Sequence, residues 1–293
     1  MTTNSDKPNS IPTVGNPDSG VHRREGLKYK ITNDEVNQYH EQGYLVLDGF
    51  LSEAEMQLLD EKFEQFVTGK VAGMGKDFCD MSQPYGTPME EFRLVNAVLP
   101  SHYCAELKNN VYQQVAQSVV DQLRPDIPSA MDYDQFLAKK PEKEGAQFSM
   151  HQDLGYWPKT EDTWTATFSL ALTDSGIENG CLQVVPGTNH EAELRSHAPA
   201  NYGDNEDSGT RDDSHTLVIE SRPDDKPVFL PVKRGSVTIH DERIVHGSGG
   251  NTSQVWRKTY VMAFRSEKTV QQERAIGFTH SHNDEVDWDT FIS

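Results

Sequence analysis

A short helical pattern followed by a strand pattern opens the ordered part of the chain. In residues 32–43, TNDEVNQYHEQG, Thr32 or Asn33 is placed to act as the N-cap, two acidic residues occupy the first turn, and Gly43 ends the helix. The run YLVLDGF at 44–50 then predicts a strand. We therefore expect a helix and then a strand at this end of the fold.

Two more helices are predicted before residue 125. Ser52 and Glu55 form a capping box, in which each side chain bonds the backbone of the other residue, so we expect a helix over 52–67. The amphipathic run AELKNNVYQQVAQSVVDQL, which ends before Pro125, predicts another helix. The rest of residues 70–145 shows no clear period.

From residue 146 onward the hydrophobic period is two, as in β-strands. In TWTATFSLALT, at 163–173, Trp164 and Phe168 lie on a hydrophobic face, whereas Thr167 and Ser169 lie on a small polar face. We expect Trp164 to lie in the core. Shorter strand patterns follow in CLQVVP, HTLVIE, PVFLPV, GSVTIH and KTYVMAF, separated by Gly, Pro, Asn and Asp. This half of the chain predicts a double sheet or a barrel.

Two stretches have the composition of segments outside a packed core. Residues 1–25 are rich in Ser, Pro, Asn and Gly and predict a disordered tail. A polar stretch at about 190–225 contains ANYGDNEDSGTRDDS and is too long for a simple connection. It predicts a lid or a disordered insertion.

Composition and charge exclude several classes of partner. The 293 residues are 35% hydrophobic, enough for a core, and 46 acidic against 27 basic residues give a net charge of −19. Nucleic acids and anionic membranes repel such a charge, so we expect neither as a partner. No apolar run is long enough to span a membrane, and no secretory signal is present. Three widely spaced cysteines, Cys79, Cys104 and Cys181, argue against a disulfide framework and predict a cytoplasmic location.

Three pairs of the form His-x-acid are candidates for metal binding. His151–Asp153 projects both side chains to one side if its backbone is extended. His240–Glu242 runs into Asp241 and Arg243, which together resemble a solvated charged turn. His282–Asp284, with His280, falls in a polar C-terminal tail with no strand after it. We therefore favour His151 and Asp153.

Iron(II) oxygenases require two neutral imidazoles and one carboxylate, so a third ligand is needed. His246 follows the strand pattern GSVTIH and supplies the second imidazole, and Arg257 lies 11 residues further on, at the start of the last strand pattern. A strand pair bridged by the Gly/Ser/Asn-rich turn between them would place both side chains in one cavity. Arg257 would then bind a carboxylate through two parallel hydrogen bonds.

Taken in order, His151-Gln-Asp, ENGCLQVVPGTNH, His246-Gly-Ser and Arg257 resemble the phytanoyl-CoA dioxygenase family of iron(II)/2-oxoglutarate oxygenases. The resemblance covers roughly residues 31–266 and is strongest from 148 onward. It implies a double-stranded β-helix, a jelly roll of the cupin kind that is mainly β with flanking helices. It also implies one domain over 26–293, with supporting helices in 31–125 and a jelly-roll core at about 130–266.

The resemblance assigns roles to individual residues. It implies that His151, Asp153 and His246 are iron ligands and that Arg257 binds the distal carboxylate of 2-oxoglutarate. Gln152, Ser248 and Ser169 match positions at the co-substrate site. At Ser169 the enzyme that gives the family its name carries a tryptophan, so the namesake substrate is not expected here. Tyr156 and Trp157 either line a substrate pocket or pack the sheet.

The activity implied is hydroxylation of a small molecule with Fe(II), 2-oxoglutarate and O₂, yielding succinate and CO₂. Desaturation, epimerisation or ring closure with the same cofactors is the alternative, and a cupin-like isomerase or non-catalytic sensor is an alternative of another class. Arg257 argues against the latter, because neither needs a 2-oxoglutarate anchor. The acidic stretch 203–225 and the neighbouring aromatic residues fit a cationic or zwitterionic substrate. The sequence does not indicate an oligomeric state.

Overall fold

Two facing antiparallel sheets form the centre of the molecule, in a computed structural model that describes residues 23–199 and 216–284. The larger sheet has the strand order β3-β13-β8-β15-β6-β5-β4, and the smaller has β12-β9-β14-β7. The larger sheet consists of β3 (Tyr44–Leu47), β4 (Phe78–Asp80), β5 (Leu94–Val98), β6 (Ser129–Lys139), β8 (Thr165–Ala171), β13 (Val237–Asp241) and β15 (Arg257–Ser266). The smaller consists of β7 (Phe148–His151), β9 (Leu182–Val185), β12 (Val228–Leu230) and β14 (Val245–Ser248).

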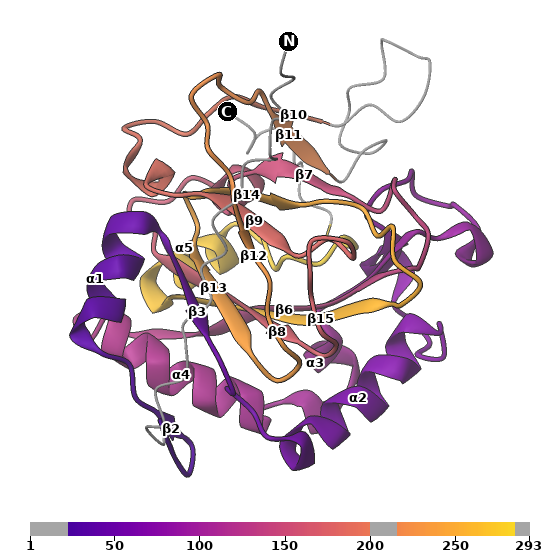
Figure 1. Cartoon of the computed structure of the whole chain (residues 1–293), viewed down its shortest axis with the longest axis horizontal. Coiled ribbons are helices and arrows are strands. Elements are labelled where there is room, and N and C mark those ends of the chain that lie inside the picture. The colour runs from indigo at the N-terminus through magenta and orange to yellow at the C-terminus, as the bar shows by residue number, and fades with distance from the viewer. Residues whose placement is uncertain (1–22, 200–215, 285–293) are drawn as a thin grey trace, which may run out of the picture.

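Helices and two short strand pairs surround these sheets. The helices are α1 (Asn33–Gln42), α2 (Glu53–Val67), α3 (Pro100–Tyr103), α4 (Val111–Leu123) and α5 (Glu267–Ala275). The strand pairs are β1 (Arg24–Glu25) with β2 (Lys28–Tyr29), and β10 (His197–Pro199) with β11 (Leu217–Ile219). In Figure 1, α2 and α4 run beneath the larger sheet and the smaller sheet lies above it. Nearly all of the predicted tail, and residues 200–215 of the predicted lid or insertion, lie outside the described residues.

The predicted starts of α1 and α2 are confirmed by their caps, whereas α4 begins at Val111, later than the predicted run from Ala105. Thr32 Oγ1 accepts a hydrogen bond from the Glu35 backbone N–H at 3.2 Å, and Glu35 Oε2 accepts from the Thr32 N–H at 2.8 Å. Gly43 closes α1 in the left-handed region, at φ 81°, which a glycine adopts without strain. The capping box of Ser52 is also present at the start of α2.

The period of two in the central strands divides each strand between two environments. On β8, Ala166, Phe168 and Leu170 belong to the hydrophobic core with the helices, whereas Thr167 and Ser169 face the other way and line a cavity. Strands β6 and β15 alternate in the same way. Trp164, just before β8, lies in the core as predicted, with 5% of its surface exposed. The larger sheet therefore has a hydrophobic outer face and a polar inner face.

This arrangement confirms the predicted class, a mainly β jelly roll with flanking helices, although its sheets are open and do not close into a barrel. Two features differ from expectation. The longest strand, β6, lies in the stretch without a clear period, and β14 and β15 are not a hydrogen-bonded pair. Instead β14 lies in the smaller sheet and β15 in the larger. Among the described residues no helix is long and apolar enough to cross a membrane.

A buried carboxyl group joins α3 to the larger sheet. Asp134 on β6 accepts hydrogen bonds from the Tyr260 hydroxyl at 2.8 Å, from the Ser101 hydroxyl at 2.9 Å and from the Ser101 backbone N–H at 3.1 Å. Burial raises the pKa of Asp134 to about 6, more than these hydrogen bonds lower it. The folded protein therefore favours the neutral form of this group.

We expect Asp134→Asn to become more stable relative to wild type as the pH rises from 4 to 7. The raised pKa means that the contribution of Asp134 is fully present below pH 4 and is lost as the pH rises through about 6, whereas asparagine does not titrate. Two pKa units correspond to about 3 kcal/mol. Urea unfolding of both proteins at pH 4, 5.5 and 7 measures the difference, and a difference independent of pH would contradict this account.

Candidate active site

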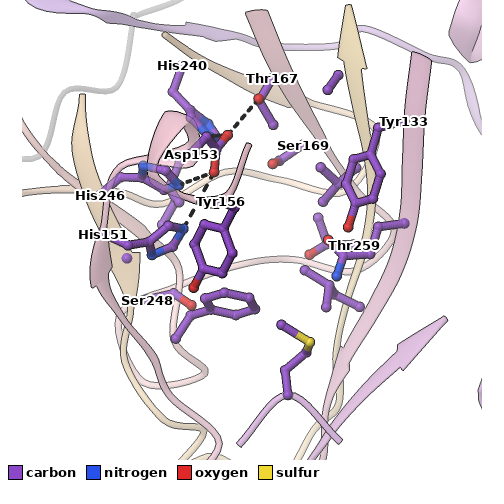
Figure 2. Close-up of a pocket in the computed structure, with 18 of the residues that line it drawn as sticks. Tyr133, His151, Asp153, Tyr156, Thr167, Ser169, His240, His246, Ser248 and Thr259 are labelled. Atoms are coloured by element: carbon purple, nitrogen blue, oxygen red, sulfur yellow. Dashed lines mark hydrogen bonds and ion pairs between the residues drawn. The ribbon is translucent and has the colours of Figure 1, made fainter. Parts of the chain in front are cut away.

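A cavity of about 140 Å³ lies between the two sheets. The larger sheet contributes the inward-facing side chains of β6, β8, β13 and β15, and the smaller contributes those of β7, β9 and β14. Figure 2 shows Thr167, Ser169, Tyr133 and Thr259 on ribbon segments across the cavity from His151 and His246. The inner polar face of the larger sheet thus becomes one wall of the site.

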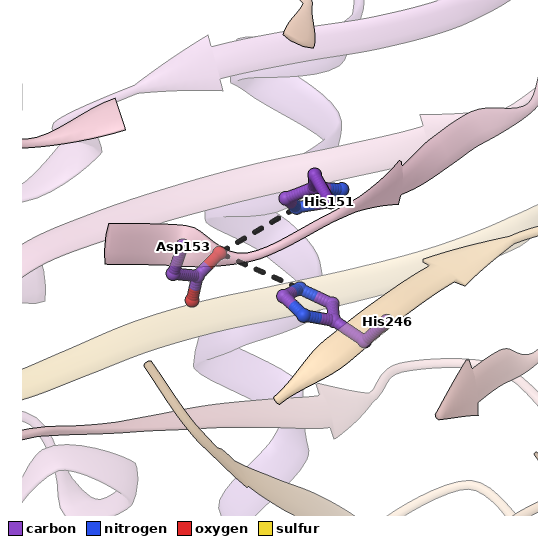
Figure 3. A group of neighbouring side chains, drawn as sticks. All are labelled: His151, Asp153 and His246. Carbon is purple, nitrogen blue, oxygen red and sulfur yellow. Dashed lines mark ion pairs between the residues drawn. The ribbon is translucent and has the colours of Figure 1, made fainter. Parts of the chain in front are cut away.

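Three of the predicted site residues meet at one end of this cavity (Figure 3). His151 Nε2 lies 3.5 Å from Asp153 Oδ1, and His246 Nε2 lies 3.4 Å from the same oxygen. His151 ends β7, His246 lies on the neighbouring strand β14, and the two are directly paired. Asp153 opens the 3₁₀ helix that follows β7. Two imidazole nitrogens and one carboxylate oxygen therefore converge on one point.

Backbone carbonyl groups fix the orientation of both imidazoles. His151 Nδ1 donates to Ser149 O at 2.7 Å, and His246 Nδ1 donates to Ile244 O at 3.0 Å. A carbonyl oxygen only accepts hydrogen bonds, so the proton of each neutral ring is on Nδ1 and Nε2 presents a lone pair. Burial lowers the pKa of both histidines, which favours this neutral form. Each ring is thus prepared to bind a metal ion through Nε2.

Asp153 is held as an anion despite its burial. Burial alone would raise the pKa of its carboxyl group, but its contacts with the three neighbouring histidines, His246 foremost, hold the pKa well below the usual range. Its second oxygen, Oδ2, accepts from Thr167 Oγ1 at 2.8 Å and from His240 Nε2 at 3.1 Å. The set has the chemistry of a divalent metal site.

Two buried cations line another part of the cavity. Arg257 and Lys139 are register partners on β15 and β6, and their exposed fractions are 8% and 1%. Burial lowers the pKa of Arg257 to about 10 and moves that of Lys139 well below its usual value. Within the described chain, neither forms an ion pair with a carboxylate. A bound anion would stabilise the charged forms of both groups, so the pair has the chemistry of an anion-binding site.

Neutral groups hold these cations in place. Lys139 Nζ donates to Ser248 Oγ at 2.6 Å and to the Gly249 carbonyl, and Arg257 Nε donates to Ser175 Oγ at 3.2 Å. Ser248 therefore lines the cavity beside Lys139. Ser169 lines the cavity from β8.

Gln152 does not take the position predicted for it. Its side chain is fully buried outside the cavity lining, with Nε2 donating to Arg243 O at 2.5 Å and Oε1 accepting from the Arg195 N–H at 2.9 Å. Neighbouring residues of an extended segment point to opposite sides, so the residue between His151 and Asp153 faces away from them. The structure thus contradicts a co-substrate contact by Gln152.

Tyr156 and Trp157 both line the cavity and pack against neighbours. The Tyr156 ring meets that of His151 edge-on at 5.4 Å, and its hydroxyl accepts from the Leu217 N–H at 2.6 Å. Trp157 forms a small cluster with Leu154 and Phe278. The two roles that the sequence left open are therefore compatible.

The segment after α5 is not the exposed polar tail expected from the sequence. Phe278, His280 and His282 line the cavity, and His280 is only 4% exposed. Arg265, fully buried at the end of β15, donates to both oxygens of Glu273 and to His280 Nε2 at 2.8 Å. Its guanidinium also stacks on the Trp157 ring at 4.2 Å. Asp132, Glu273 and His280 bring three ligand atoms within 4.8 Å of one another, but Arg265 already supplies the positive charge among them.

The turn expected at 241–243 is present, but it is not solvated throughout. Glu242 is 2% exposed, and burial raises its pKa to about 7. His240 faces the cavity from β13 and bonds to Asp153. Strand β13 is a central strand, between β3 and β8, so its end is covered on both sides. The run of charged residues at 241–243 gave no sign that Glu242 is buried.

Sequence reasoning missed Lys139 as a site residue. Lys139 ends the apolar run FLAK, within a stretch where no strand period was recognised. Only its pairing with Arg257 indicates that it belongs to the site. A lysine at the end of a hydrophobic run was the local signal, and the sequence does not show that Arg257 lies opposite it. Tyr133 and Thr259 reach the cavity through the same alternation.

Comparison with known proteins gives one family match and several similar folds. The family model for phytanoyl-CoA dioxygenase (PhyH) matches residues 39–259. The peroxisomal phytanoyl-CoA dioxygenase of Rattus norvegicus is 26% identical over 275 residues, covering 86% of this chain and 76% of that protein. The structure of EvdO2 from Micromonospora carbonacea var. aurantiaca complexed with 2-oxoglutarate has a TM-score of 0.64 at 19% identity, covering 81% of this chain and 91% of that one. The alpha-ketoglutarate-dependent carbocyclase SnoK from nogalamycin biosynthesis has a TM-score of 0.61 at 22% identity, covering 80% and 84%.

We expect Arg265→Met to destabilise the protein by about 3–5 kcal/mol, because it leaves the buried carboxylate of Glu273 without its arginine. Glu273 is fully buried, and Asp132 is 7% exposed at its side chain. Urea unfolding measures the loss. The control is Arg274→Met, whose side chain is 35% exposed and also pairs with Asp132, and it should cost less than about 1 kcal/mol. Equal losses in the two variants would argue against a special role for the buried pair.

Proposed function

Because the chain belongs to the phytanoyl-CoA dioxygenase family of iron(II)/2-oxoglutarate-dependent oxygenases, we propose that it hydroxylates a small-molecule substrate in the cavity between its sheets. The observation that carries the proposal is the convergence of His151, Asp153 and His246 in a cavity that is also lined by two buried basic side chains, Arg257 and Lys139. The first feature suits a metal ion and the second suits a dicarboxylate.

The three converging residues fit iron(II). Two neutral imidazoles and one carboxylate, all on one side of a point, are the donor set of non-heme iron oxygenases. We propose that His151 and His246 bind through Nε2 and that Asp153 binds through Oδ1. Iron and 2-oxoglutarate, when bound, would allow O₂ to oxidise a C–H bond of the substrate. One oxygen atom would enter the substrate and the other would enter succinate, with loss of CO₂.

Arg257 and Lys139 would bind the distal carboxylate of 2-oxoglutarate. The planar guanidinium of Arg257 matches a carboxylate with two parallel hydrogen bonds, and Lys139 adds a second charge beside it. Ser248, bonded to Lys139 at 2.6 Å, holds that amine toward the cavity. These groups position the co-substrate and neutralise it where water is largely excluded.

The rest of the cavity wall indicates how a substrate would be bound. Aromatic rings of Tyr133, Phe148, Tyr156 and Trp157 face the cavity, and the one carboxylate among its described lining residues is Asp153. Such rings support a cationic or zwitterionic substrate through their faces. A cation would be held by these faces and not by an ion pair, because Asp153 is assigned to the metal.

Family membership argues against the cupin-like isomerase and the non-catalytic sensor. Desaturation, epimerisation and ring closure share the same cofactors and stay as alternatives to hydroxylation. Asp153 keeps the carboxylate ligand, which related halogenases replace with a small residue, so it argues against halogenation, and we take hydroxylation as the default reaction of this class. A cytoplasmic location also stays a prediction.

We expect the metal-free protein, titrated anaerobically with Fe(II) and then 2-oxoglutarate, to develop the weak visible charge-transfer band of a chelated complex. His151→Ala, Asp153→Ala and His246→Ala should each abolish the band and iron-dependent succinate release, because each removes a ligand. His190→Ala, at an exposed histidine outside the cavity lining, is the control. Iron binding without the band, or a band retained in the three variants, would refute the proposed function.

We expect Arg257→Ala to weaken 2-oxoglutarate binding about 100-fold and Lys139→Met about tenfold, because each removes a charge-assisted hydrogen bond. Calorimetric titration of 2-oxoglutarate into the Mn(II)-loaded protein measures both. Lys140→Met, which changes the next residue along the chain and leaves the cavity lining intact, should bind as wild type does. Unchanged affinity in Arg257→Ala would overturn its assignment.

A further inference from the structure

The two oxygens of Asp153 have different neighbours. Oδ1 faces His151 and His246, at 3.5 and 3.4 Å, whereas Oδ2 accepts hydrogen bonds from Thr167 at 2.8 Å and from His240 at 3.1 Å. Figure 2 shows these contacts on opposite sides of the carboxylate. The carboxylate is therefore anchored at one oxygen and available at the other.

A single pairing of strands positions both anchoring groups. Thr167 on β8 and His240 on β13 are direct register partners, and both side chains point from the larger sheet toward Asp153. Both are nearly inaccessible to solvent, at 4% and 3% exposure. The ring of His240 also lies 4.1 Å from that of His246. The anchor thus belongs to the rigid centre of the larger sheet.

Stability alone does not explain a histidine at position 240. Its Nε2 must carry the proton, because a carboxylate oxygen accepts hydrogen bonds and does not donate them. Its Nδ1 is then a buried acceptor, and within the described part of the chain it has no hydrogen-bond partner. Such an atom destabilises the folded state. The contact that His240 makes with Asp153 therefore indicates a role in the site.

We propose that Thr167 and His240 are positioning residues that keep Asp153 bound to the metal through one oxygen, an inference that rests on the proposed function. Two donors on Oδ2 oppose the rotation that would bring this oxygen onto the metal. A carboxylate bound through both oxygens would occupy one of the positions that the co-substrate and O₂ require. The two residues thus protect the open face of the metal without touching it.

The test separates the hydrogen bond to Oδ2 from the volume of the side chain. Thr167→Val removes the hydroxyl at nearly constant shape, and Thr167→Ser retains it. His240→Phe removes the donor, and His240→Gln restores an N–H donor. Thr238→Val is the matched control, since Thr238 is a buried threonine two residues before His240 on β13 and outside the cavity lining.

Mn(II) is the probe, with its affinity measured by the electron paramagnetic resonance of the free ion and 2-oxoglutarate affinity measured calorimetrically on the loaded protein. We expect Thr167→Val and His240→Phe each to weaken one of these affinities by about 10- to 100-fold, as partners of metal ligands do. Thr167→Ser, His240→Gln and Thr238→Val should stay within about threefold of wild type. The double variant should lose less than the product of the two single losses, because both act on one oxygen.

The outcomes distinguish failure of the positioning role from failure of the proposed function. If both affinities are unchanged in Thr167→Val and His240→Phe, or if Thr167→Ser is as impaired as Thr167→Val, the positioning role is refuted. Loss of thermal stability without loss of affinity would show a merely structural role and refute it too. If wild type binds no Mn(II), or Asp153→Ala binds it equally well, the proposed function fails and this inference fails with it.

Discussion

The alternation of side chains along β6, β8 and β15 is the constraint on which the rest of the structure depends. Because successive residues of a strand point to opposite faces, the sheet that buries Phe168 and Leu170 against the helices must present Thr167 and Ser169 on its other side. A polar inner face is tolerable only if its groups are bonded to one another or to a ligand. The smaller sheet and the segment after α5 cover this face, and together they make a cavity whose chemistry follows from the strand register.

Local signals were enough to predict the features that depend on neighbours in the sequence. The capping boxes at Thr32 and Ser52 specify their helices through contacts three residues apart, and the alternation at 163–173 specifies β8 without reference to the rest of the fold. His151 and Asp153 are two residues apart, so their meeting is also local. His246 was found through its place after a strand pattern and before Arg257, although those two residues lie on facing sheets and not on a strand pair.

Features that depend on which strands pair were not predictable from one sequence. Lys139 is recognised as a site residue only from the register between β6 and β15, because nothing in the run FLAK shows that Arg257 lies opposite it. Glu242 belongs to a run of charges that would be solvated at a sheet edge, but it is buried because β13 is a central strand. His280 is buried beside the ion pair between Arg265 and Glu273, and no spacing in the sequence predicts that pair. In each case tertiary contacts override the local composition.

Asp153 also has a mechanical meaning, because a single side chain spans the gap between the two layers. Its backbone continues from β7 of the smaller sheet, whereas its Oδ2 is bound to β8 and β13 of the larger. The position of Oδ1 beside His151 and His246 therefore depends on how far apart the two layers lie at this end of the cavity.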